Sequence, residues 1–398
     1  MSPVAGWGLT RAWMRAGWRA ADALAAPWRC QRPAPAAEKV RRLLLLRRGA
    51  LGDLLLLRPA LERARELFPA AAITLLVRSE YEKFLEQAQL GIALWTVAAG
   101  WDAWSMPPRE FDAAIDLHAD PRWLPLGRRH ARWLAGSGVR GGGFLLDREL
   151  PFEPGREAAA RWVGMIEAAA GQPLCGEVRW RRLAPAPQWR AAAAGVWPET
   201  LPAPLLLHPG CGTAAKRWPA AHWLDLLRRC RAQGWPLLLT GAIAEARDCA
   251  ALIQAAGGGA INLAGQTDWS ALAGLAARAR AVVAPDTGMV HLARALGTPT
   301  VALFGPHAPA VWGADEAMGG GPHRNLAHPL PCSFCGRGRC RLPAVPPGGY
   351  SPCMQALSAE EVWQALQAVL RPAAASITFR SAPAPAIAPA PARHARPA

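Results

Sequence analysis

The sequence predicts an α/β protein made of two doubly wound, Rossmann-like domains that face each other across a cleft. Short buried strands alternate with helices twice along the chain, first between residues 40 and 170 and again between 204 and 370. This alternation is typical of parallel sheets covered by helices on both faces. The chain has 398 residues, which is too long for one ordinary domain and comfortable for two.

Each of the two regions predicts its own series of elements. In the first we expect a strand at 40–47, a helix at 53–66, a strand at 71–78, a short helix at 81–88, a strand and loop at 111–120, a loop region at 141–155 and a helix at 157–170. In the second we expect strands at 204–210, 235–241, 260–265, 280–286 and 298–305, and helices at 219–234, 244–255, 269–279, 287–297 and 358–370. The last helix begins with a predicted capping box, Ser358 to Glu361.

Composition predicts the domain boundaries. Residues 1–38 form a basic, Trp-rich amphipathic arm, 39–190 an N-terminal domain and 191–372 a C-terminal domain, and 373–398 is a Pro- and Ala-rich tail that we expect to be disordered. The Pro- and Ala-rich stretch at 183–203 is interpreted as the linker between the two domains.

Charge and cysteine content narrow the class of protein. The formal net charge is +16 and the pI about 10.7, which favours an anionic partner such as nucleic acid, a membrane surface or a phosphorylated substrate. The sequence has no zinc finger, RNA-binding sheet motif or helix-turn-helix, so nucleic-acid binding is the weakest of these interpretations. No apolar run is long enough to span a membrane and no secretory signal is evident. We therefore expect a cytoplasmic protein whose nine cysteines are reduced.

The arm permits two interpretations. As a helix it places Arg11, Arg15 and Arg19 in one wedge. Its apolar side chains lie opposite or beside this wedge: Trp7, Trp13, Trp18 and Leu24. Trp next to Arg suits the headgroup layer of a bilayer, so the arm is a candidate for peripheral contact with the inner membrane. The alternatives are a helix that packs on the protein's own surface and a wrongly chosen start codon.

The loop "LHPGCGTAAKRWP" is a candidate phosphate site. Gly210 and Gly212 let the backbone approach a ligand, and Lys216 adds a cation. Lys216 is one of only three lysines in a chain that otherwise uses arginine, which hints at a need for a compact ammonium group. The alternative is a surface lysine before a helix that begins with proline. The loop is not a Walker A motif, and no GxGxxG motif stands between a strand and a helix.

The loop "VVAPDTGMVHLARALG" contains a second candidate anion site. Asp286 ends a strand, and the amides of Gly288 and Met289 point out of the start of a helix, where an anion is stabilised. His291 follows one turn later, close enough to contact a phosphate or a sugar. The alternatives are that Asp286 only caps the helix and that His291 is structural.

The stretch "LLLLRRGALGDLLLLRP" places one acidic side chain between two runs of leucine. Asp53 either caps the helix that follows or does chemistry at the carboxyl end of the strand. Both roles are compatible, because capping would fix the position of the carboxylate.

These three loops resemble the hallmark segments of glycosyltransferase family 9. "RRGALGDLLLLRPALERARELFP", "LHPGCGTAAKRWP" and "PDTGMVHLARALGTPTVALFGP" stand in the order and spacing of that family, and the resemblance covers about residues 40 to 370. The family comprises the bacterial heptosyltransferases of lipopolysaccharide core assembly and their relatives. The resemblance implies a GT-B fold and inverting sugar transfer from a nucleotide sugar, usually ADP-heptose. It also implies that the acceptor binds the N-terminal domain and the donor the C-terminal domain.

The resemblance also assigns roles to residues. Asp53, after Gly52, would be the general base that takes the proton from the acceptor hydroxyl. Lys216 and the amides at the start of the helix after Asp286 would balance the charge on the departing ADP. No Asp-x-Asp metal motif is evident, so we expect a reaction without metal or further cofactor. The donor-side candidates are Thr213, Lys216, Glu245, Asp286, Thr287, Gly288, Met289 and His291.

On the acceptor side, "IDLHADPR" resembles the family's segment after a middle strand. The candidate residues in this segment are Asp116, His118 and Arg122. Gly52, next to Asp53, is a further acceptor-side candidate. Further arginines would suit an anionic glycolipid of the lipopolysaccharide core and lipid A type: Arg128, Arg129 and Arg140. For each single arginine, a solvated basic surface is the simpler interpretation.

Four cysteines near the C-terminus form a separate pattern. Cys332, Cys335, Cys340 and Cys353 are spaced C-x2-C-x4-C-x12-C, which matches the usual four-cysteine zinc sites only loosely. We prefer a structural or redox-inert cluster to a zinc site.

The function with the most support is therefore an inverting glycosyltransferase at the inner face of the inner membrane. Two alternatives remain. One is a GT-B-like sugar-nucleotide epimerase, which would need no acceptor. The other is a catalytically inactive nucleotide-sugar-binding protein of the envelope pathway.

Overall fold

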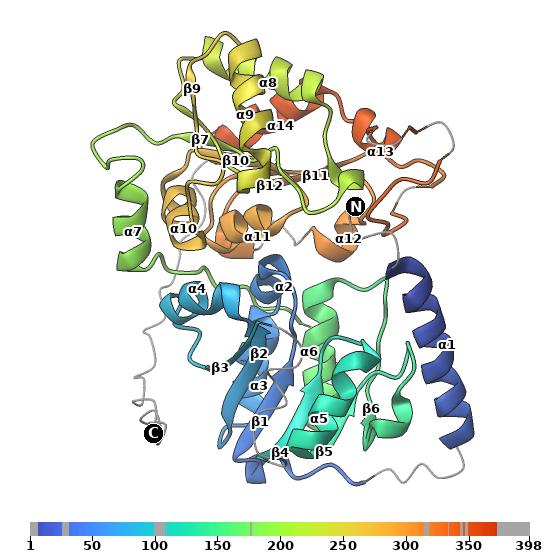
Figure 1. Ribbon diagram of the computed structural model, residues 1–398. Helices are drawn as coiled ribbons and strands as arrows, with labels where there is room; N and C mark the ends of the chain where they lie inside the picture. Colours follow the sequence, from blue (N-terminus) through green and yellow to red (C-terminus); the bar gives the residue numbers. More distant parts are fainter. Residues whose placement is uncertain are drawn as a thin grey trace, which may run out of the picture.

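The computed structural model has two lobes, each built around one parallel sheet (Figure 1). It describes residues 7–25, 32–98, 108, 110–175, 177–313, 318–332, 334–342, 345–346 and 349–371, with side chains described from residue 16 onward in the first of these ranges. The predicted tail at 373–398 lies outside the described residues. The same holds for four side chains of the arm: Trp7, Arg11, Trp13 and Arg15.

The N-terminal sheet has six strands in the order β3-β2-β1-β4-β5-β6. The strands are β1 (Arg42–Leu46), β2 (Ala72–Arg78), β3 (Ala93–Val97), β4 (Phe111–Asp116), β5 (Ala131–Gly136) and β6 (Arg148–Glu149). The run Leu43 to Leu46 of β1 is fully buried in the middle of the sheet. An uninterrupted apolar strand of this kind needs helices on both faces, and it therefore occupies the centre.

The C-terminal sheet also has six strands, in the order β12-β11-β10-β7-β8-β9. The strands are β7 (Leu205–Leu207), β8 (Leu237–Leu239), β9 (Ala260–Asn262), β10 (Ala281–Pro285), β11 (Thr300–Phe304) and β12 (His323–Ala327). Both sheets thus have the same winding, in which the first and fourth strands of the lobe lie side by side. In such sheets a crevice forms where the winding reverses, beyond the carboxyl ends of these two strands.

Helices cover the sheets, as the alternating pattern predicts. In the N-terminal lobe they are α2 (Leu51–Leu56), α3 (Arg58–Leu67), α4 (Glu82–Gln87), α5 (Leu124–His130) and α6 (Ala158–Ala169). In the C-terminal lobe they are α7 (Pro187–Ala194), α8 (Ala220–Ala232), α9 (Ala246–Ala255), α10 (Trp269–Arg278), α11 (Gly288–Ala295), α12 (Pro309–Trp312), α13 (Pro352–Gln355) and α14 (Ala359–Leu370). The predicted capping box of α14 is confirmed, because the Glu361 amide donates to Ser358 Oγ and the Ser358 amide to Glu361 Oε2.

One buried apolar cluster continues from lobe to lobe. It joins Leu43 and Leu45 of β1 to Leu206 of β7 and Val282 of β10 through the helices at the junction. Figure 1 shows α2 of the lower lobe against α11 of the upper lobe at this junction. Because burial of apolar surface stabilises the contact, the two lobes are held together rather than merely linked.

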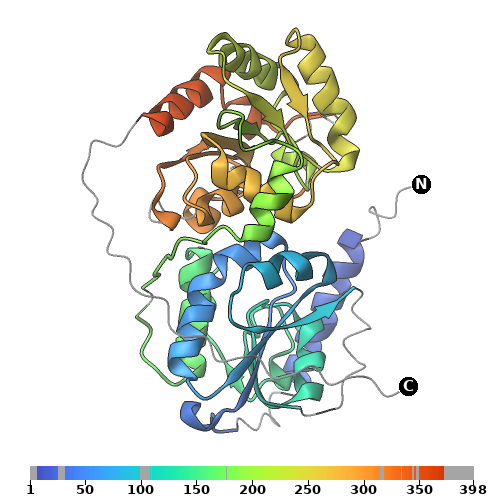
Figure 2. The same ribbon diagram turned by 90° about the vertical axis from the view of Figure 1, so that its left-hand side faces the viewer.

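Three predicted elements differ from the structure. The helix expected at 53–66 is two helices, α2 and α3, because Pro59 stands at the second position of α3 and starts a new helix. The stretch 183–203 is more than a linker, since it contains α7, whose Trp189 is buried. Figure 2 shows α7, in bright green, where the lobes meet. Strands β3, β5 and β12 were not expected, and the loop region 141–155 includes β6.

Helix α1 (Trp7–Ala25) packs on the N-terminal lobe through side chains of its second half. The ring of Trp18 stacks on Phe144 with centroids 5.9 Å apart, and the amide of Phe144 donates to Asp22 Oδ1. Within the described residues, no helix is long and apolar enough to cross a membrane.

Candidate functional site

The backbones of the two lobes come close together at Gly52. A Cβ atom at this position would lie 2.5 Å from His291 Cδ2 and 3.4 Å from Gly288 Cα. Only glycine fits there, because any side chain would push α2 away from the start of α11. The candidate Gly52 of the acceptor side and the candidates Gly288 and His291 of the donor side are thus neighbours.

Asp53 follows directly, in the first turn of α2 and in the loop after β1. Its Oδ2 accepts the amide hydrogen of Ala50 at 3.1 Å and forms an ion pair with Arg47 Nη2 at 3.2 Å. The side chain is 25% exposed. The capping role considered from the sequence is therefore real, since Asp53 satisfies the free amide before the helix. Gly49 leaves room for it, because a Cβ there would lie 2.6 Å from Asp53 Oδ2.

Asp286, after β10, is the centre of a charged cluster in the donor lobe. Its Oδ2 lies 2.7 Å from Lys216 Nζ and 2.7 Å from His307 Nδ1, and its Oδ1 lies 3.6 Å from His291 Nε2. Lys216 also donates to the Asp286 carbonyl at 2.8 Å. Burial opposes ionisation of Asp286, but the hydrogen bonds with His291 and His307 and the charge of Lys216 outweigh burial and hold its pKa well below the usual range. Asp286 does not cap α11, because no side chain accepts at that helix start.

Two buried hydroxyl groups beside this cluster have no hydrogen-bond partner among the described residues. They belong to Thr213, after β7, and Thr287, at the start of α11. An unpaired buried hydroxyl is costly, so such groups in a crevice are suited to accept or donate to a ligand. The first amides of α11, at Gly288 and Met289, point out of the same helix start, where negative charge is stabilised.

Glu245 joins two loops of the donor lobe. Its Oε1 accepts the amide hydrogen of Cys211 at 2.9 Å, and its Oε2 accepts that of Ala242 at 2.7 Å. Neither Gly210 nor Gly241 has room for a Cβ beside this carboxylate, which explains both glycines. Each carboxylate oxygen can accept a second hydrogen bond, so the predicted contact with a nucleoside stays open.

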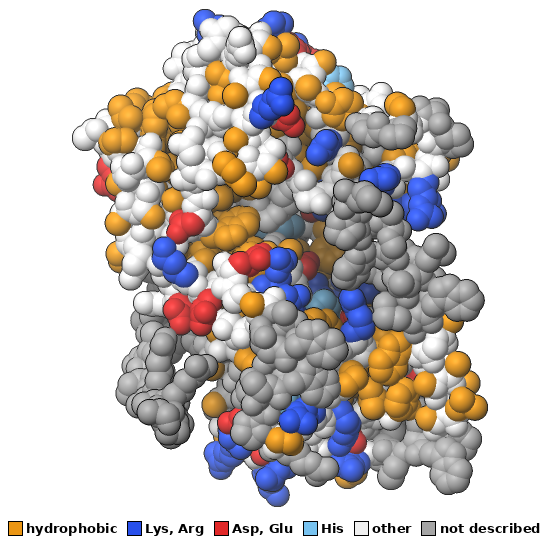
Figure 3. All heavy atoms as spheres, viewed as in Figure 1, with side chains coloured by type: hydrophobic (Ala, Val, Ile, Leu, Met, Phe, Trp, Pro, Cys, Tyr) orange, Lys and Arg blue, Asp and Glu red, His pale blue; other side chains and the backbone are white. Residues whose placement is uncertain are grey.

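A cavity of about 620 Å³ lies between the lobes. Lys83 and Phe84 of the N-terminal lobe line one side, and Glu245, Thr287 and Gly288 line the other. Figure 3 shows the surface hollowed between the lobes, with acidic, basic and histidine side chains around the hollow. The volume is in the range of small-molecule sites, and the helix start and the unpaired hydroxyl of Thr287 supply donors for an anion.

Beside this cavity the lobes share polar contacts. Lys83 Nζ lies 3.1 Å from Asp268 Oδ2, and Gln87 Oε1 accepts from Trp189 Nε1 and Ser270 Oγ. These contacts link α4 to α7 and α10.

On the acceptor side, Asp116 and His118 follow β4, next to β1. Burial raises the pKa of Asp116 to about 7, although its carboxylate accepts the amides of His118 and Ala119. Burial, and then the charge of Arg47, lower the pKa of His118 to about 4, so this ring is neutral near pH 7. Both residues are therefore inside the lobe and support the loop.

The predicted arginines divide into two groups. Arg122 pairs with Asp120 of its own loop and is partly exposed. Arg128 pairs with the buried Asp147, and the same carboxylate accepts the amide of Leu134, so Arg128 is a structural residue.

The arrangement of loops and motifs is matched by known proteins. A family model described as glycosyltransferase family 9 (heptosyltransferase) matches residues 144–335. Over 330 residues the chain is 28% identical to lipopolysaccharide heptosyltransferase 1 of Pseudomonas aeruginosa, covering 75% of this chain and 87% of the relative. The chain is thus similar to glycosyltransferase family 9 over these ranges.

Solved structures share the fold of this chain. ADP-heptose lipopolysaccharide heptosyltransferase II of E. coli has a TM-score of 0.66 at 18% identity, covering 83% of this chain and 98% of that chain. An E. coli heptosyltransferase with ADP-2-deoxy-2-fluoro heptose has a TM-score of 0.60 at 19% identity, covering 82% and 99%. The predicted GT-B fold and the prediction that the chain is a glycosyltransferase are thereby confirmed.

The sequence did not point to several residues of the candidate site. His307 binds Asp286. It follows the carboxyl end of β11, the same kind of position as that of the other candidate residues. Arg47 lies in the loop sequence that contains Asp53, but it was expected inside the strand; β1 ends one residue earlier, at Leu46, and Arg47 contacts Asp53 from the loop. Trp162 and Trp312 meet across the lobes with ring centroids 6.5 Å apart, and nothing in the sequence links them.

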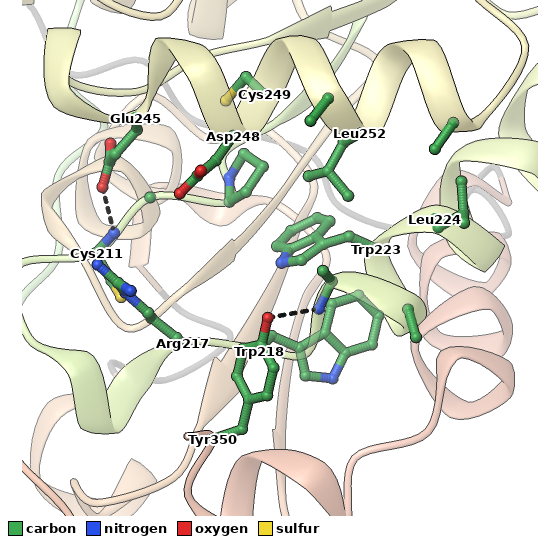
Figure 4. A pocket seen from close by; sticks show the side chains of 16 residues that line it. Cys211, Arg217, Trp218, Trp223, Leu224, Glu245, Asp248, Cys249, Leu252 and Tyr350 are labelled. Atoms are coloured by element: carbon green, nitrogen blue, oxygen red, sulfur yellow. Dashed lines mark hydrogen bonds between the residues drawn. The ribbon is translucent and has the colours of Figure 1, made fainter. Parts of the chain in front are cut away.

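A second pocket of about 430 Å³ lies behind the donor loop, between α8 and α9. Figure 4 shows Glu245 and Cys211 at one end and Trp223, Leu224 and Leu252 at the other. Glu245 and Cys211 also line the cavity between the lobes. The bond from the Cys211 amide to Glu245 therefore forms a shared wall of the two spaces.

The four cysteines near the C-terminus do not form a metal site in the geometry described. Cys332 and Cys335 are exposed, Cys340 is partly exposed and Cys353 is buried. In the described part of the chain, no group of three or more His, Cys, Asp or Glu residues is arranged to hold a metal ion. The geometry therefore gives the zinc hypothesis no support.

Proposed function

We propose that this chain is a family 9 enzyme that transfers a heptose from ADP-heptose to an anionic acceptor of the lipopolysaccharide core, with inversion and with Asp53 as the general base. The observation that carries the proposal is the junction at Gly52. It brings the loop that holds Asp53 against the start of α11, where Gly288 and the Asp286 cluster lie. A base on one lobe and an anion site on the other are what transfer between two bound substrates requires.

The chemistry follows from these positions. Asp53 takes the proton of the acceptor hydroxyl while that oxygen attacks the anomeric carbon of the donor. The bond from this carbon to the diphosphate breaks, and the electron pair leaves with ADP. Attack from the face opposite the diphosphate inverts the anomeric configuration. Lys216, Thr213, Thr287 and the amides of α11 stabilise the charge that develops on the diphosphate.

The identity of the donor and acceptor is supported by the relatives. One solved structure is named for ADP-heptose, and another contains ADP-2-deoxy-2-fluoro heptose. The Pseudomonas aeruginosa relative is a lipopolysaccharide heptosyltransferase. A net charge of +16 suits an anionic glycolipid and the membrane surface that carries it. We therefore propose that the enzyme acts as a peripheral membrane protein at the cytoplasmic face of the inner membrane, and that the arm contacts this membrane.

The test is the substitution Asp53→Asn, which keeps the size of the side chain and its acceptor for the Ala50 amide. We expect transfer to fall by about a hundredfold to ten-thousandfold, while the affinity for ADP, measured by calorimetry, stays unchanged. Full activity of Asp53→Asn would reject the base. A reaction with donor alone, analysed for a new sugar nucleotide, separates transfer from epimerisation.

A further inference from the structure

Arg47 is a buried arginine in the middle of the acceptor side. Its side chain is 9% exposed, and its guanidinium lies 4.6 Å from the centre of the Trp162 ring. Its Nη1 lies 3.5 Å from the Leu117 carbonyl oxygen and 3.4 Å from His118 Nδ1, and its Nη2 lies 3.2 Å from Asp53 Oδ2. A guanidinium held on so many sides has little freedom to move.

The residues around Arg47 are themselves fixed. Trp162 Nε1 donates to the same Leu117 carbonyl at 3.1 Å, and His118 Nε2 contacts the Arg48 carbonyl at 3.2 Å. His118 is neutral near pH 7 and can accept from Arg47 through Nδ1. The partners on β4 and α6 thus hold Arg47 against the loop after β1.

The two oxygens of Asp53 differ as a result. Oδ2 is engaged twice, by Arg47 and by the Ala50 amide. Oδ1 has no hydrogen-bond donor among the residues that the structure describes, on a side chain that is one-quarter exposed. The carboxylate therefore has one anchored oxygen and one available oxygen.

We propose that Arg47 is the positioning residue for proton transfer, which anchors Asp53 through Oδ2 so that Oδ1 receives the proton of the acceptor hydroxyl. This inference rests on the proposed role of Asp53 as the base. In the step, the acceptor O–H bond breaks and an O–H bond forms at Oδ1, while Arg47 stays protonated throughout. Arg47 itself touches neither substrate, and its effect passes through the carboxylate.

Geometry explains why this position needs arginine. A planar guanidinium stacks on the indole face and presents its nitrogens to three partners at once. A lysine would keep the positive charge but could not hold the same set of contacts. Two buried titratable groups interact electrostatically with this pair: Asp116 on β4 with Arg47, and Arg161 on α6 with both Arg47 and Asp53.

The test compares Arg47→Gln and Arg47→Lys with the unchanged enzyme. Misplacement of a catalytic group by a fraction of an ångström lowers the rate by about tenfold to about a hundredfold. We expect that loss in kcat for Arg47→Gln, with the KM for the donor and the affinity for ADP within about twofold of the original. Arg47→Lys should regain part of the kcat, which a merely structural role would not produce.

A matched control is Arg42→Gln at the other end of the same strand. Arg42 forms an exposed ion pair with Glu110, so its loss should leave kcat unchanged. If Arg47→Gln unfolds, as shown by loss of ADP binding, Arg47→Lys carries the comparison. Unchanged kcat in a folded Arg47 variant would overturn the positioning role.

A double substitution separates this inference from the proposal on which it rests. If Arg47 acts only through Asp53, Asp53→Asn with Arg47→Gln is no slower than Asp53→Asn alone. A further loss in the double variant would show that Arg47 acts elsewhere and overturn its role. Activity retained by Asp53→Asn would instead reject the base itself.

Discussion

The loops after β1 and β10, two central strands of their sheets, each carry an aspartate, yet the two carboxylates have opposite environments. Asp53 is 25% exposed, with Arg47 and the Ala50 amide on one oxygen and the other oxygen available. Asp286 is 6% exposed and is bound by Lys216 and His307, with His291 close by. One of the two central strands is thus followed by an available carboxylate and the other by an enclosed one.

The different partners of Asp53 and Asp286 suit the two carboxylates to different tasks. An enclosed aspartate cannot reach a substrate, but it can hold Lys216 and two histidines in fixed places beside a phosphate. An available aspartate can exchange a proton, provided that something fixes its direction. The partners of each carboxylate therefore suit it to its role.

The largest effect on stability is expected from removing the charge of Asp286. Asp286→Asn leaves Lys216 without its buried partner, and we expect a loss of about 3 to 5 kcal/mol in the free energy of unfolding, measured with urea. Because the pKa of Asp286 is depressed in the folded protein, its contribution is present above the pKa of the unfolded chain and is lost only as pH falls toward the folded value.

The matched control for Asp286 is Asp225→Asn on α8. Asp225 forms an exposed ion pair with Arg229 four residues later, and such pairs contribute about 0.5 kcal/mol or less. Equal losses in the two variants would show that the Asp286 cluster is not a buried network.

The comparison also shows what the sequence predicts and why. Asp53, Lys216 and Asp286 were found because each follows a strand at a point where parallel sheets place their ligands, and local sequence is enough to locate such loops. His307 and Arg47 were missed because they act through partners on other strands. Local patterns do not encode such long-range neighbours, and the aromatic pair Trp162 and Trp312 is of the same kind.

Strands were missed for a different reason. β12 contains His323, Arg324 and Asn325 and lies at the edge of its sheet, where only part of the strand is buried. A polar edge strand lacks the apolar run that predicts a central strand such as β1.

Gly52→Ala tests the contact that brings the two aspartate loops together. The added Cβ would lie 2.5 Å from His291 Cδ2, so the lobes must separate, at a cost of about 1 to 3 kcal/mol. We expect kcat to fall by about tenfold or more. ADP affinity, which depends on the donor lobe, should change little by calorimetry.

Gly164→Ala on α6 is the control for the Gly52 substitution. A Cβ at this helical position meets only Leu174 Cδ2, at 3.9 Å, so we expect stability to rise by about 0.5 to 1 kcal/mol with kcat unchanged. If Gly52→Ala behaves in the same way, the lobes have room to spare at this junction.

The smallest expected effect concerns Asp116, the buried neighbour of the Asp53 loop. Burial raises its folded pKa to about 7, far above that of an unfolded chain, so the folded state holds a proton that the unfolded state has lost. Stability from this group therefore falls as pH rises toward the folded pKa, by about 1 kcal/mol between pH 6 and pH 7.

Asp116→Asn removes this titration while keeping an acceptor for one of the two amides that Asp116 binds. The difference in unfolding free energy between the variant and the unchanged enzyme should shift in favour of the variant as pH rises. His118 titrates in the opposite sense at lower pH but is present in both proteins, so it cancels in the difference. A difference that stays constant with pH would place the Asp116 carboxylate in a more polar setting than its burial implies. The environment of this carboxylate would then resemble that of the available Asp53 more than that of the enclosed Asp286.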